Sequence, residues 1–197
     1  MMTDAKSFLF VLASSRDGGN TEALAREAAA QLPAGTEQRW LRLADFPLPP
    51  FKDLRHAGEG ADRELGEHER LLLEATLAAT DVVIVSPLYW YSVSSSAKLY
   101  LDHWSHWLRL PGVDFKERMG AKTFWSVSVM ANADDAVAEP LLGTLRLSAA
   151  YFGARWGGGL LGHATRPGGV LTDGVALERA REFFAVDREP VGVGTAK

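Results

Sequence analysis

The chain has 197 residues, the length of a single domain, and 47% of them are hydrophobic, which excludes a chain that is disordered throughout. Lys and Arg number 21 against 25 Asp and Glu, so the formal net charge is −4, whereas nucleic-acid-binding proteins usually carry a basic surplus. The absence of cysteine excludes disulfides and thiolate metal sites, and no apolar run approaches the roughly 20 residues that cross a bilayer.

Predicted strands and helices alternate along the chain. Apolar or β-branched runs predict strands at residues 8–13, 36–43, 81–86, 122–130 and 155–161. Good helix formers or apolar residues at helical spacing predict helices at residues 22–32, 63–80, a segment from Ser92 or Ser94 to Leu108, 136–152 and 175–185. Five strand–helix units of this kind are typical of an α/β domain with a parallel sheet.

Polar residues predict where helices begin, and proline marks a long loop. Asn20 or Thr21 is expected to cap the first helix, and Thr172 or Asp173 the last. Residues 44–62 contain three prolines and are expected to form a loop. We expect one domain over residues 1–185 and a mobile tail over residues 186–197. Residues 1–7 show no signal peptide, which indicates a cytoplasmic protein without a membrane partner.

The predicted architecture is a flavodoxin-like, doubly wound, five-stranded parallel sheet in the order 2-1-3-4-5. Ligands of such sheets bind beyond the carboxyl ends of the strands, where the strand order reverses. In this order the reversal lies between strands one and three. The loops that follow residues 8–13 and 81–86 are therefore the expected site, and the loop at residues 130–134 is expected to border it.

The loop after the first predicted strand has the composition of a phosphate site. Hydroxyl, small and basic side chains precede a helix at Ser14, Ser15, Arg16, Gly18, Gly19, Asn20 and Thr21. Free N–H groups at a helix N-terminus bind anions, and glycines let the backbone approach them closely. A capped helix after a flexible turn would have the same residues.

The loop after the third predicted strand is aromatic. It reads Ser-Pro-Leu-Tyr-Trp-Tyr-Ser from Ser86 to Ser92. Three consecutive aromatic residues at the carboxyl end of a strand indicate the wall of a ligand site, although a hydrophobic plug under the loop would also need them. A phosphate loop beside an aromatic shelf suits a phosphorylated flat heterocycle.

These two loops resemble those of the NAD(P)H-dependent FMN reductases and related quinone reductases. The likeness lies in Ser14-x-Arg16 with Gly19-Asn-Thr21, in residues 86–93 followed by Lys98-Leu-Tyr-Leu-Asp102, and in residues 43–49. Two features depart from the family pattern. Residues 130–134 lack the glycines that follow the fourth strand in the family, and Trp90-Tyr91 replaces its Asn-Gly.

The resemblance implies an FMN site and an enzyme. Ser14, Arg16, Gly19, Asn20 and Thr21 would hold the FMN phosphate. Pro87, Leu88, Tyr89, Trp90 and Ser92 would follow the edge of the isoalloxazine ring, largely through backbone groups. NAD(P)H would be the co-substrate, and a quinone, a flavin or a similar small molecule the electron acceptor, in a ping-pong reaction with no assigned catalytic side chain. A homodimer or homotetramer is expected.

Two other functions stay open at this point. One is a flavodoxin-type electron carrier with a protein partner, although the long loop and the aromatic shelf favour an enzyme. The other is a binding protein that keeps the fold and has lost FMN, which the missing glycines after the fourth strand leave open. Fold alone does not decide among these functions.

Several motifs are weaker signals. Gly157-x-Gly159-x-x-Gly162 matches a dinucleotide fingerprint but precedes no predicted helix, so it is interpreted as incidental. Ser95-x-x-Lys98 lacks the companion motifs of penicillin-recognising enzymes. His103 and His106 have metal-ligand spacing, but a surface helix flanked by Trp104 and Trp107 is the preferred interpretation, and a subunit contact is a variant of it. The charged residues between 63 and 70 are interpreted as a solvated helix face.

Overall fold

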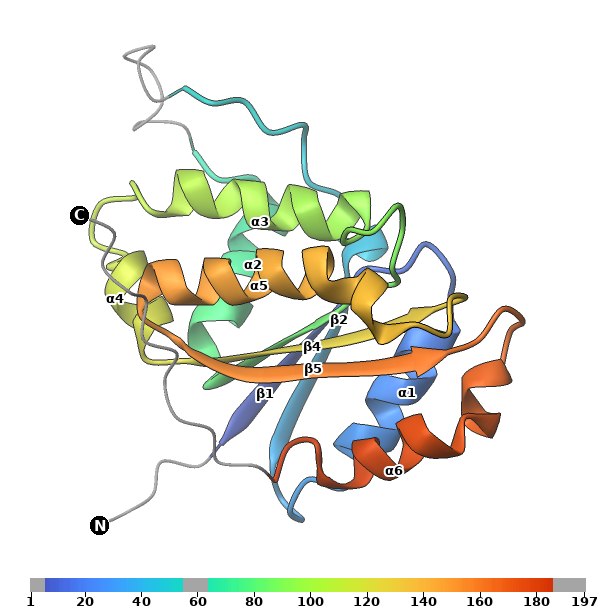
Figure 1. Ribbon diagram of the computed structural model, residues 1–197. Helices are drawn as coiled ribbons and strands as arrows, with labels where there is room; N and C mark the ends of the chain where they lie inside the picture. Colours follow the sequence, from blue (N-terminus) through green and yellow to red (C-terminus); the bar gives the residue numbers. More distant parts are fainter. Residues whose placement is uncertain (1–5, 55–63, 186–197) are drawn as a thin grey trace, which may run out of the picture.

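The predicted architecture is confirmed by a computed structural model, which describes residues 6–54 and 64–185. Within these residues the strands form one parallel sheet in the order β2-β1-β3-β4-β5 (Figure 1). The strands are β1 (Ser7–Leu12), β2 (Glu37–Arg42), β3 (Asp81–Val85), β4 (Thr123–Met130) and β5 (Arg155–His163). The predicted tail at residues 186–197 lies outside the described residues.

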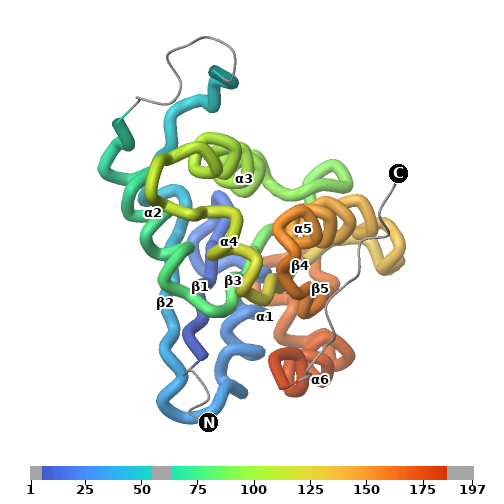
Figure 2. The backbone as a smooth tube through the Cα atoms, turned by 90° about the vertical axis from the view of Figure 1, so that its left-hand side faces the viewer, coloured from blue at the N-terminus to red at the C-terminus, as the bar shows by residue number. Residues whose placement is uncertain are grey.

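Helices cover both faces of the sheet. One layer contains α2 (Glu67–Ala78), α3 (Ser95–Trp107), α4 (Phe115–Gly120) and α5 (Glu139–Phe152) (Figure 1). The other contains α1 (Asn20–Ala29) and α6 (Gly174–Glu182), and Figure 2 shows the two layers from the side. No described helix combines the length and the apolar character that a membrane span needs.

The alternation of side chains along β1 explains why its sequence is apolar throughout. Leu9 and Val11 join the core under α2, α3 and α5. Phe8 and Phe10 join a second core that α1 and α6 cover. Because successive side chains of a strand point to opposite faces, a strand covered on both faces has no position for a polar residue.

The glycines of β5 serve packing. At Gly157 a Cβ atom would lie 2.3 Å from the indole ring of Trp125 on the neighbouring strand, where the register shifts between Phe124 and Trp125. Trp125 is itself anchored, since its Nε1 donates to Asp81 Oδ1 over 2.9 Å. Gly157, Gly159 and Gly162 all lie inside β5, so the interpretation of their spacing as incidental is confirmed.

Some predicted boundaries were wrong. The helix expected over residues 136–152 begins as a 3-10 turn, η2 (Asp135–Ala138), because Pro140 at its start has no N–H to donate. Helix α4 was not predicted, since six residues are too short for a clear periodicity. Ser94, one of the two predicted starts of its helix, caps α3, and Asp173, one of the two predicted caps, caps α6; each accepts from a backbone N–H three residues on. Strand β5 runs on to His163.

The prediction that the charged residues near position 70 form a solvated face is wrong for Glu69. This carboxylate is buried, and its Oε1 lies 3.0 Å from His103 Nδ1, 3.1 Å from His106 Nδ1 and 3.1 Å from Trp107 Nε1. A buried charge requires partners of this kind. His103 therefore lies inside the protein rather than at a surface, and among the described residues no His, Asp and Glu side chains group as metal ligands.

Candidate functional site

The two loops expected to form the site meet at the carboxyl end of the sheet. Ala13, just after β1, donates its backbone N–H to Val85 O over 2.9 Å. The carbonyl of Ala13 accepts from Ser94 Oγ over 2.6 Å and from Ser96 Oγ over 3.0 Å. The start of α3 is thereby hydrogen-bonded to the loop that leads into α1.

The loop after β3 is also joined to β4. Ser86 donates its backbone N–H to Val127 O over 3.0 Å, and Leu88 donates to Val129 O over 3.4 Å. The Ser86 hydroxyl accepts from the backbone N–H of Ser94 over 2.9 Å. Pro87 is buried and Leu88 is half-buried, so residues 86–88 form a fixed backbone edge along the end of the sheet.

The N-terminus of α1 is open. The N-cap residue is Gly19, neither Asn20 nor Thr21 as predicted, and no side-chain hydrogen bond caps this end of the helix. Gly18 has a φ of +58°, a conformation that glycine adopts without strain. The helix thus presents uncapped N–H groups, with partial positive charge, beside the hydroxyl of Ser14, which accepts from the Arg16 N–H over 3.1 Å.

The side chain of Asn20 connects this loop to the loop after β5. Its Nδ2 donates to Arg166 O over 2.8 Å. Its Oδ1 is buried and finds no hydrogen-bond partner among the described residues. A buried amide oxygen of this kind usually has a donor. Arg166 is a neighbour of the candidate site that the sequence did not indicate, since it lies 146 positions from Asn20.

Arg42, at the end of β2, is a second residue that the sequence did not indicate. Its guanidinium donates to Arg16 O over 3.1 Å, to Asp17 Oδ1 over 2.5 Å and to Glu22 Oε2 over 2.8 Å. Both the backbone of the loop and the first turn of α1 are thereby attached to β2.

The same contacts neutralise the acidic side chains beside the open helix end. Burial alone would raise the pKa of Glu22, but hydrogen bonds from Arg26 and Arg42 hold that pKa below its usual value. Glu22 is therefore ionised and paired. Arg16 is exposed and forms no ion pair with any described residue, so its charge is available to an anion at the loop.

The aromatic segment forms a tight turn. Tyr89 and Ser92 exchange two backbone hydrogen bonds of 3.0 Å each. The central residues, Trp90 and Tyr91, have φ values of 50° and 63°, a conformation in which Asn and Gly are the usual residues. Each costs about 1 kcal/mol or more here, and strain of this kind collects at functional sites.

The three aromatic side chains of this turn point into solvent. Trp90 is 93% exposed, and Tyr89 and Tyr91 are also exposed. This exposure shows that the three rings do not form a hydrophobic plug under the loop, whereas their role as the wall of a ligand site stays a prediction. Ser92 is exposed beside them.

The loop after β4 lies next to the loop after β5. Ala164 donates its backbone N–H to Met130 O over 2.9 Å, and His163 Nε2 lies 3.0 Å from Asp135 Oδ1. Asn132 Oδ1 accepts from the Asp134 N–H over 2.9 Å, so this loop is ordered by its own side chains without glycine. The expected site residues therefore lie along one edge, and Arg166 and Arg42 complete their surroundings.

Comparison with known proteins agrees with this arrangement. Residues 7–159 match the family described as NADPH-dependent FMN reductase. The chain belongs to this family. A protein of Bacillus subtilis (strain 168) named as an NAD(P)H-dependent FMN-containing oxidoreductase, YwqN, is 32% identical over 171 residues, which cover 86% of this chain and 92% of that relative.

Solved structures show the same fold as this FMN reductase family member. The Trp repressor binding protein from Bacillus subtilis superposes with a TM-score of 0.70 at 25% identity, covering 89% of this chain and 96% of that one. An azoreductase from Bacillus anthracis str. Sterne superposes with a TM-score of 0.63 at 18% identity, covering 90% and 97%. The family resemblance and the fold inferred from the sequence are both confirmed.

Proposed function

We propose that this protein is an FMN-dependent NAD(P)H oxidoreductase that passes two electrons from a nicotinamide to a quinone, a flavin or a similar small acceptor. The observation that carries the proposal is the open N-terminus of α1 at the loop of residues 14–19, next to the fixed edge of residues 86–88. The first is suited to a phosphate and the second to the edge of a flat ring.

The residues present fit FMN. Ser14, Arg16, Asn20 and Thr21 would hold the phosphate together with the uncapped N–H groups after Gly19, and the buried Asn20 Oδ1 needs a donor that a bound ligand or an ordered water supplies. Pro87, Leu88, Tyr89, Trp90 and Ser92 would follow the ring edge. When bound, FMN supplies the hydride and electron chemistry, and the protein supplies binding and orientation.

We assign no side chain as a general acid or base, because FMN would carry the hydride and electron chemistry. The residues along the edge of 86–92 position a ring and offer backbone groups to it, whereas no proton donor is required from a side chain. The side chains of the turn at Trp90 and Tyr91 are exposed, and we propose that substrates would reach the ring from solvent on this side. An accessible face suits a ping-pong reaction, in which the nicotinamide leaves before the acceptor enters.

A visible spectrum of the purified protein reconstituted with FMN tests the function. A bound flavin that loses its absorbance rapidly when NADPH or NADH is added anaerobically supports the proposal. A bound flavin that ignores both nucleotides, yet takes up electrons one at a time from dithionite, would identify an electron carrier instead. A protein that binds no flavin would contradict both and leave a binding protein that has lost FMN.

Replacing Arg16 or Thr21 with alanine tests the phosphate loop. Each change should weaken FMN binding by about 1–3 kcal/mol, because each removes a donor to a charged group. Titration with FMN, followed by the quenching of flavin fluorescence, measures the loss. Unchanged affinity in both variants would show that the phosphate binds elsewhere.

A further inference from the structure

His163 lies at the end of β5 with a carboxylate beside each of its ring nitrogens. Its Nε2 lies 3.0 Å from Asp135 Oδ1, and its Nδ1 lies 3.4 Å from Asp173 Oδ2. The contact with Asp135 is an ion pair, since the two atoms are not aligned for a hydrogen bond. Carboxylates on both sides favour the imidazolium form, which carries an N–H on each nitrogen and shares its charge between them.

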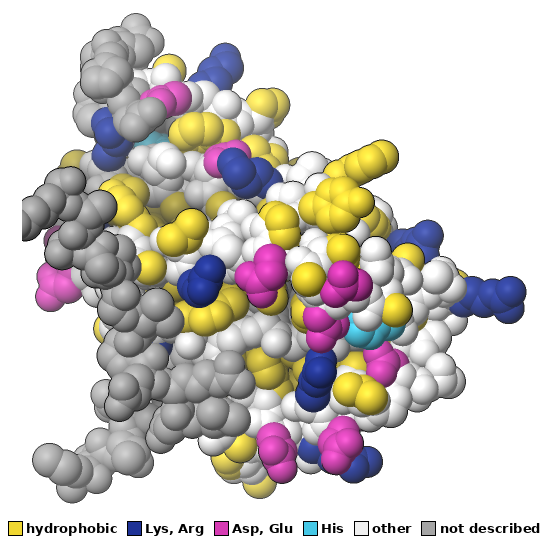
Figure 3. Space-filling model, viewed as in Figure 1, with side chains coloured by type: hydrophobic (Ala, Val, Ile, Leu, Met, Phe, Trp, Pro, Cys, Tyr) yellow, Lys and Arg dark blue, Asp and Glu magenta, His cyan; other side chains and the backbone are white. Residues whose placement is uncertain are grey.

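Arg179 of α6 completes a cluster of balanced charge. Its guanidinium donates to Asp135 Oδ2 over 3.0 Å, so the two oxygens of Asp135 face two different cations. With His163 charged, two positive and two negative side chains meet. Burial alone would raise the pKa of Asp173, but hydrogen bonds from the backbone N–H groups of Ala176 and His163 hold it below its usual value. Figure 3 shows histidine, acidic and basic side chains gathered on this face, near the start of α5 and the end of β5.

The contact with Asp135 leads to the backbone edge of residues 86–88. Asp135 is the first residue of η2, and Ala138 is the last. Ala138 is buried in a small core with Met130 and Leu161, against which Leu88 packs. A displacement of η2 would therefore move the support under Leu88.

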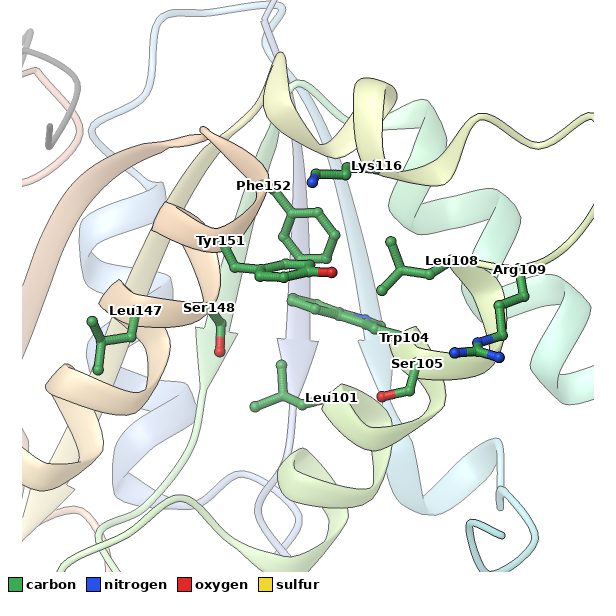
Figure 4. A pocket seen from close by; sticks show the side chains of 10 residues that line it. All are labelled: Leu101, Trp104, Ser105, Leu108, Arg109, Lys116, Leu147, Ser148, Tyr151 and Phe152. Carbon is green, nitrogen blue, oxygen red and sulfur yellow. The ribbon is translucent and has the colours of Figure 1, made fainter. Parts of the chain in front are cut away.

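The far half of α5 has an attachment of its own. The ring of Phe152 lies 5.6 Å from that of Trp104 on α3 and 5.7 Å from that of Phe115 on α4. Figure 4 shows Phe152, Tyr151 and Trp104 close together at this end, where they line a groove between α3, α4 and α5. Loss of the contact at Asp135 would therefore loosen the start of α5 and leave the rest of the helix in place.

The segments on the other side of His163 are attached to α1. Asp173 caps α6 and accepts from the backbone N–H of His163 over 2.8 Å. A Cβ atom at Gly162 would lie 2.9 Å from Leu24, so β5 and α1 meet closely here. The amide of Asn20 on α1 donates to the loop after β5. The carboxylates on either side of His163 thus belong to segments that contact different parts of the candidate site.

We propose that His163 is a positioning residue for FMN, which acts through Asp135 by holding η2 against the end of β5 and thereby fixing the ring edge at residues 86–88. The inference rests on the proposed function, because FMN is the ligand whose binding it explains. Residues 130–134 contain no glycine through which the backbone could approach a ring closely, so the place of this loop depends on side-chain contacts.

Titration of His163→Ala with FMN tests this role. At about pH 6, where histidine is ordinarily protonated, we expect the dissociation constant to rise about 3- to 10-fold, which is what one or two partly exposed ion pairs contribute. His163→Lys keeps a positive charge within reach of Asp135 and should recover most of the affinity. His163→Gln is similar in size but uncharged and should not. Riboflavin affinity should fall by the same factor as FMN affinity, because the ring edge moves and the phosphate loop does not.

A variant of Asp135 supplies the second half of the test. If the two side chains act through their contact, Asp135→Ala combined with His163→Ala should lose no more affinity than the larger of the single losses. Glu178→Ala is the matched control, since it removes an exposed carboxylate of α6 beside Arg179 and should leave FMN affinity unchanged.

Hydrogen exchange of the protein without flavin gives a result that does not depend on FMN. The amides of residues 135–138 should exchange faster in His163→Ala than in the wild type, and His163→Lys should restore the slower rate. Amides in the second half of α5 should exchange at the wild-type rate in all three proteins.

The outcomes separate this inference from the proposed function. Wild-type FMN affinity in His163→Ala, equal affinities of His163→Lys and His163→Gln, or unchanged exchange at residues 135–138 would overturn the positioning role and leave an FMN-binding protein. A wild-type protein that binds no flavin would overturn the proposed function, and the positioning role with it.

Discussion

FMN binding is expected to weaken about 10- to 100-fold when Arg42 is replaced by glutamine. The guanidinium holds the loop through the Arg16 carbonyl and the first turn of α1 through Glu22, so its loss releases the loop and leaves buried Glu22 with fewer partners. Hydrogen bonds to charged groups each contribute about 1.5–3 kcal/mol, which sets this range. Fluorescence titration of the folded variant with FMN measures the change.

Riboflavin and Arg39 supply the controls for this prediction. Riboflavin has no phosphate, so a variant that loses only the phosphate loop should bind it as the wild type does. Arg39→Gln changes an exposed arginine of the same strand and should leave FMN affinity unchanged. Equal losses for FMN and riboflavin would mean that Arg42 supports the sheet edge in general and does not position the phosphate loop.

The free energy of unfolding is expected to fall by about 3 kcal/mol or more when Gly157 is replaced by alanine. The new Cβ would lie 2.3 Å from the indole of Trp125, which is buried in the core. The indole is held by Asp81 and by the rings of Phe183 and Phe184, each 5.2 Å away, so it has no free volume into which to move. Overpacking of a rigid core costs stability on this scale. Urea denaturation followed by tryptophan fluorescence measures it.

Gly143→Ala is the matched control for the change at Gly157. Gly143 lies inside α5, and no described atom beyond its own helix and chain neighbours lies within 4 Å of a Cβ placed there. Alanine favours the helix over glycine by up to about 1 kcal/mol, so this variant should be at least as stable as the wild type. If Gly157→Ala were as stable as Gly143→Ala, the indole of Trp125 would be able to move away from the new Cβ, and the prediction would be wrong.

The fold could be predicted because its strands are covered on both faces. Burial on both sides leaves continuous apolar runs such as residues 8–13 and 82–85, and these are visible without knowledge of their partners. Glu69 shows the limit of this reasoning. Its sequence neighbourhood is charged, and only the packing of α2 against α3 brings His103 and Trp107 to it. A buried cluster of hydrogen-bonded side chains from distant segments leaves no periodic pattern in the sequence.

The candidate site, like the fold, could be predicted only in part. The residues of the loops after β1 and β3 were recognisable because each loop is contiguous and chemically distinctive. Arg42 and Arg166 act across the sheet edge, through contacts with residues far away in the sequence, so nothing near them in the sequence marks them. Trp90 and Tyr91 were recognised as unusual, but their direction depends on left-handed backbone angles that composition does not reveal.

The link from Asn20 to Arg166 has a consequence for the synthesis of the protein. The loop after β1 emerges early from the ribosome, but its partners on α3 follow about 80 residues later and Arg166 after 146. Arg42 follows the loop after only 26 residues, but the contacts from α3 and Arg166 are added only when most of the chain has been made. A cofactor that depends on this loop would be acquired by the finished chain, and the proportion of protein that carries it would report how much of the population has folded completely.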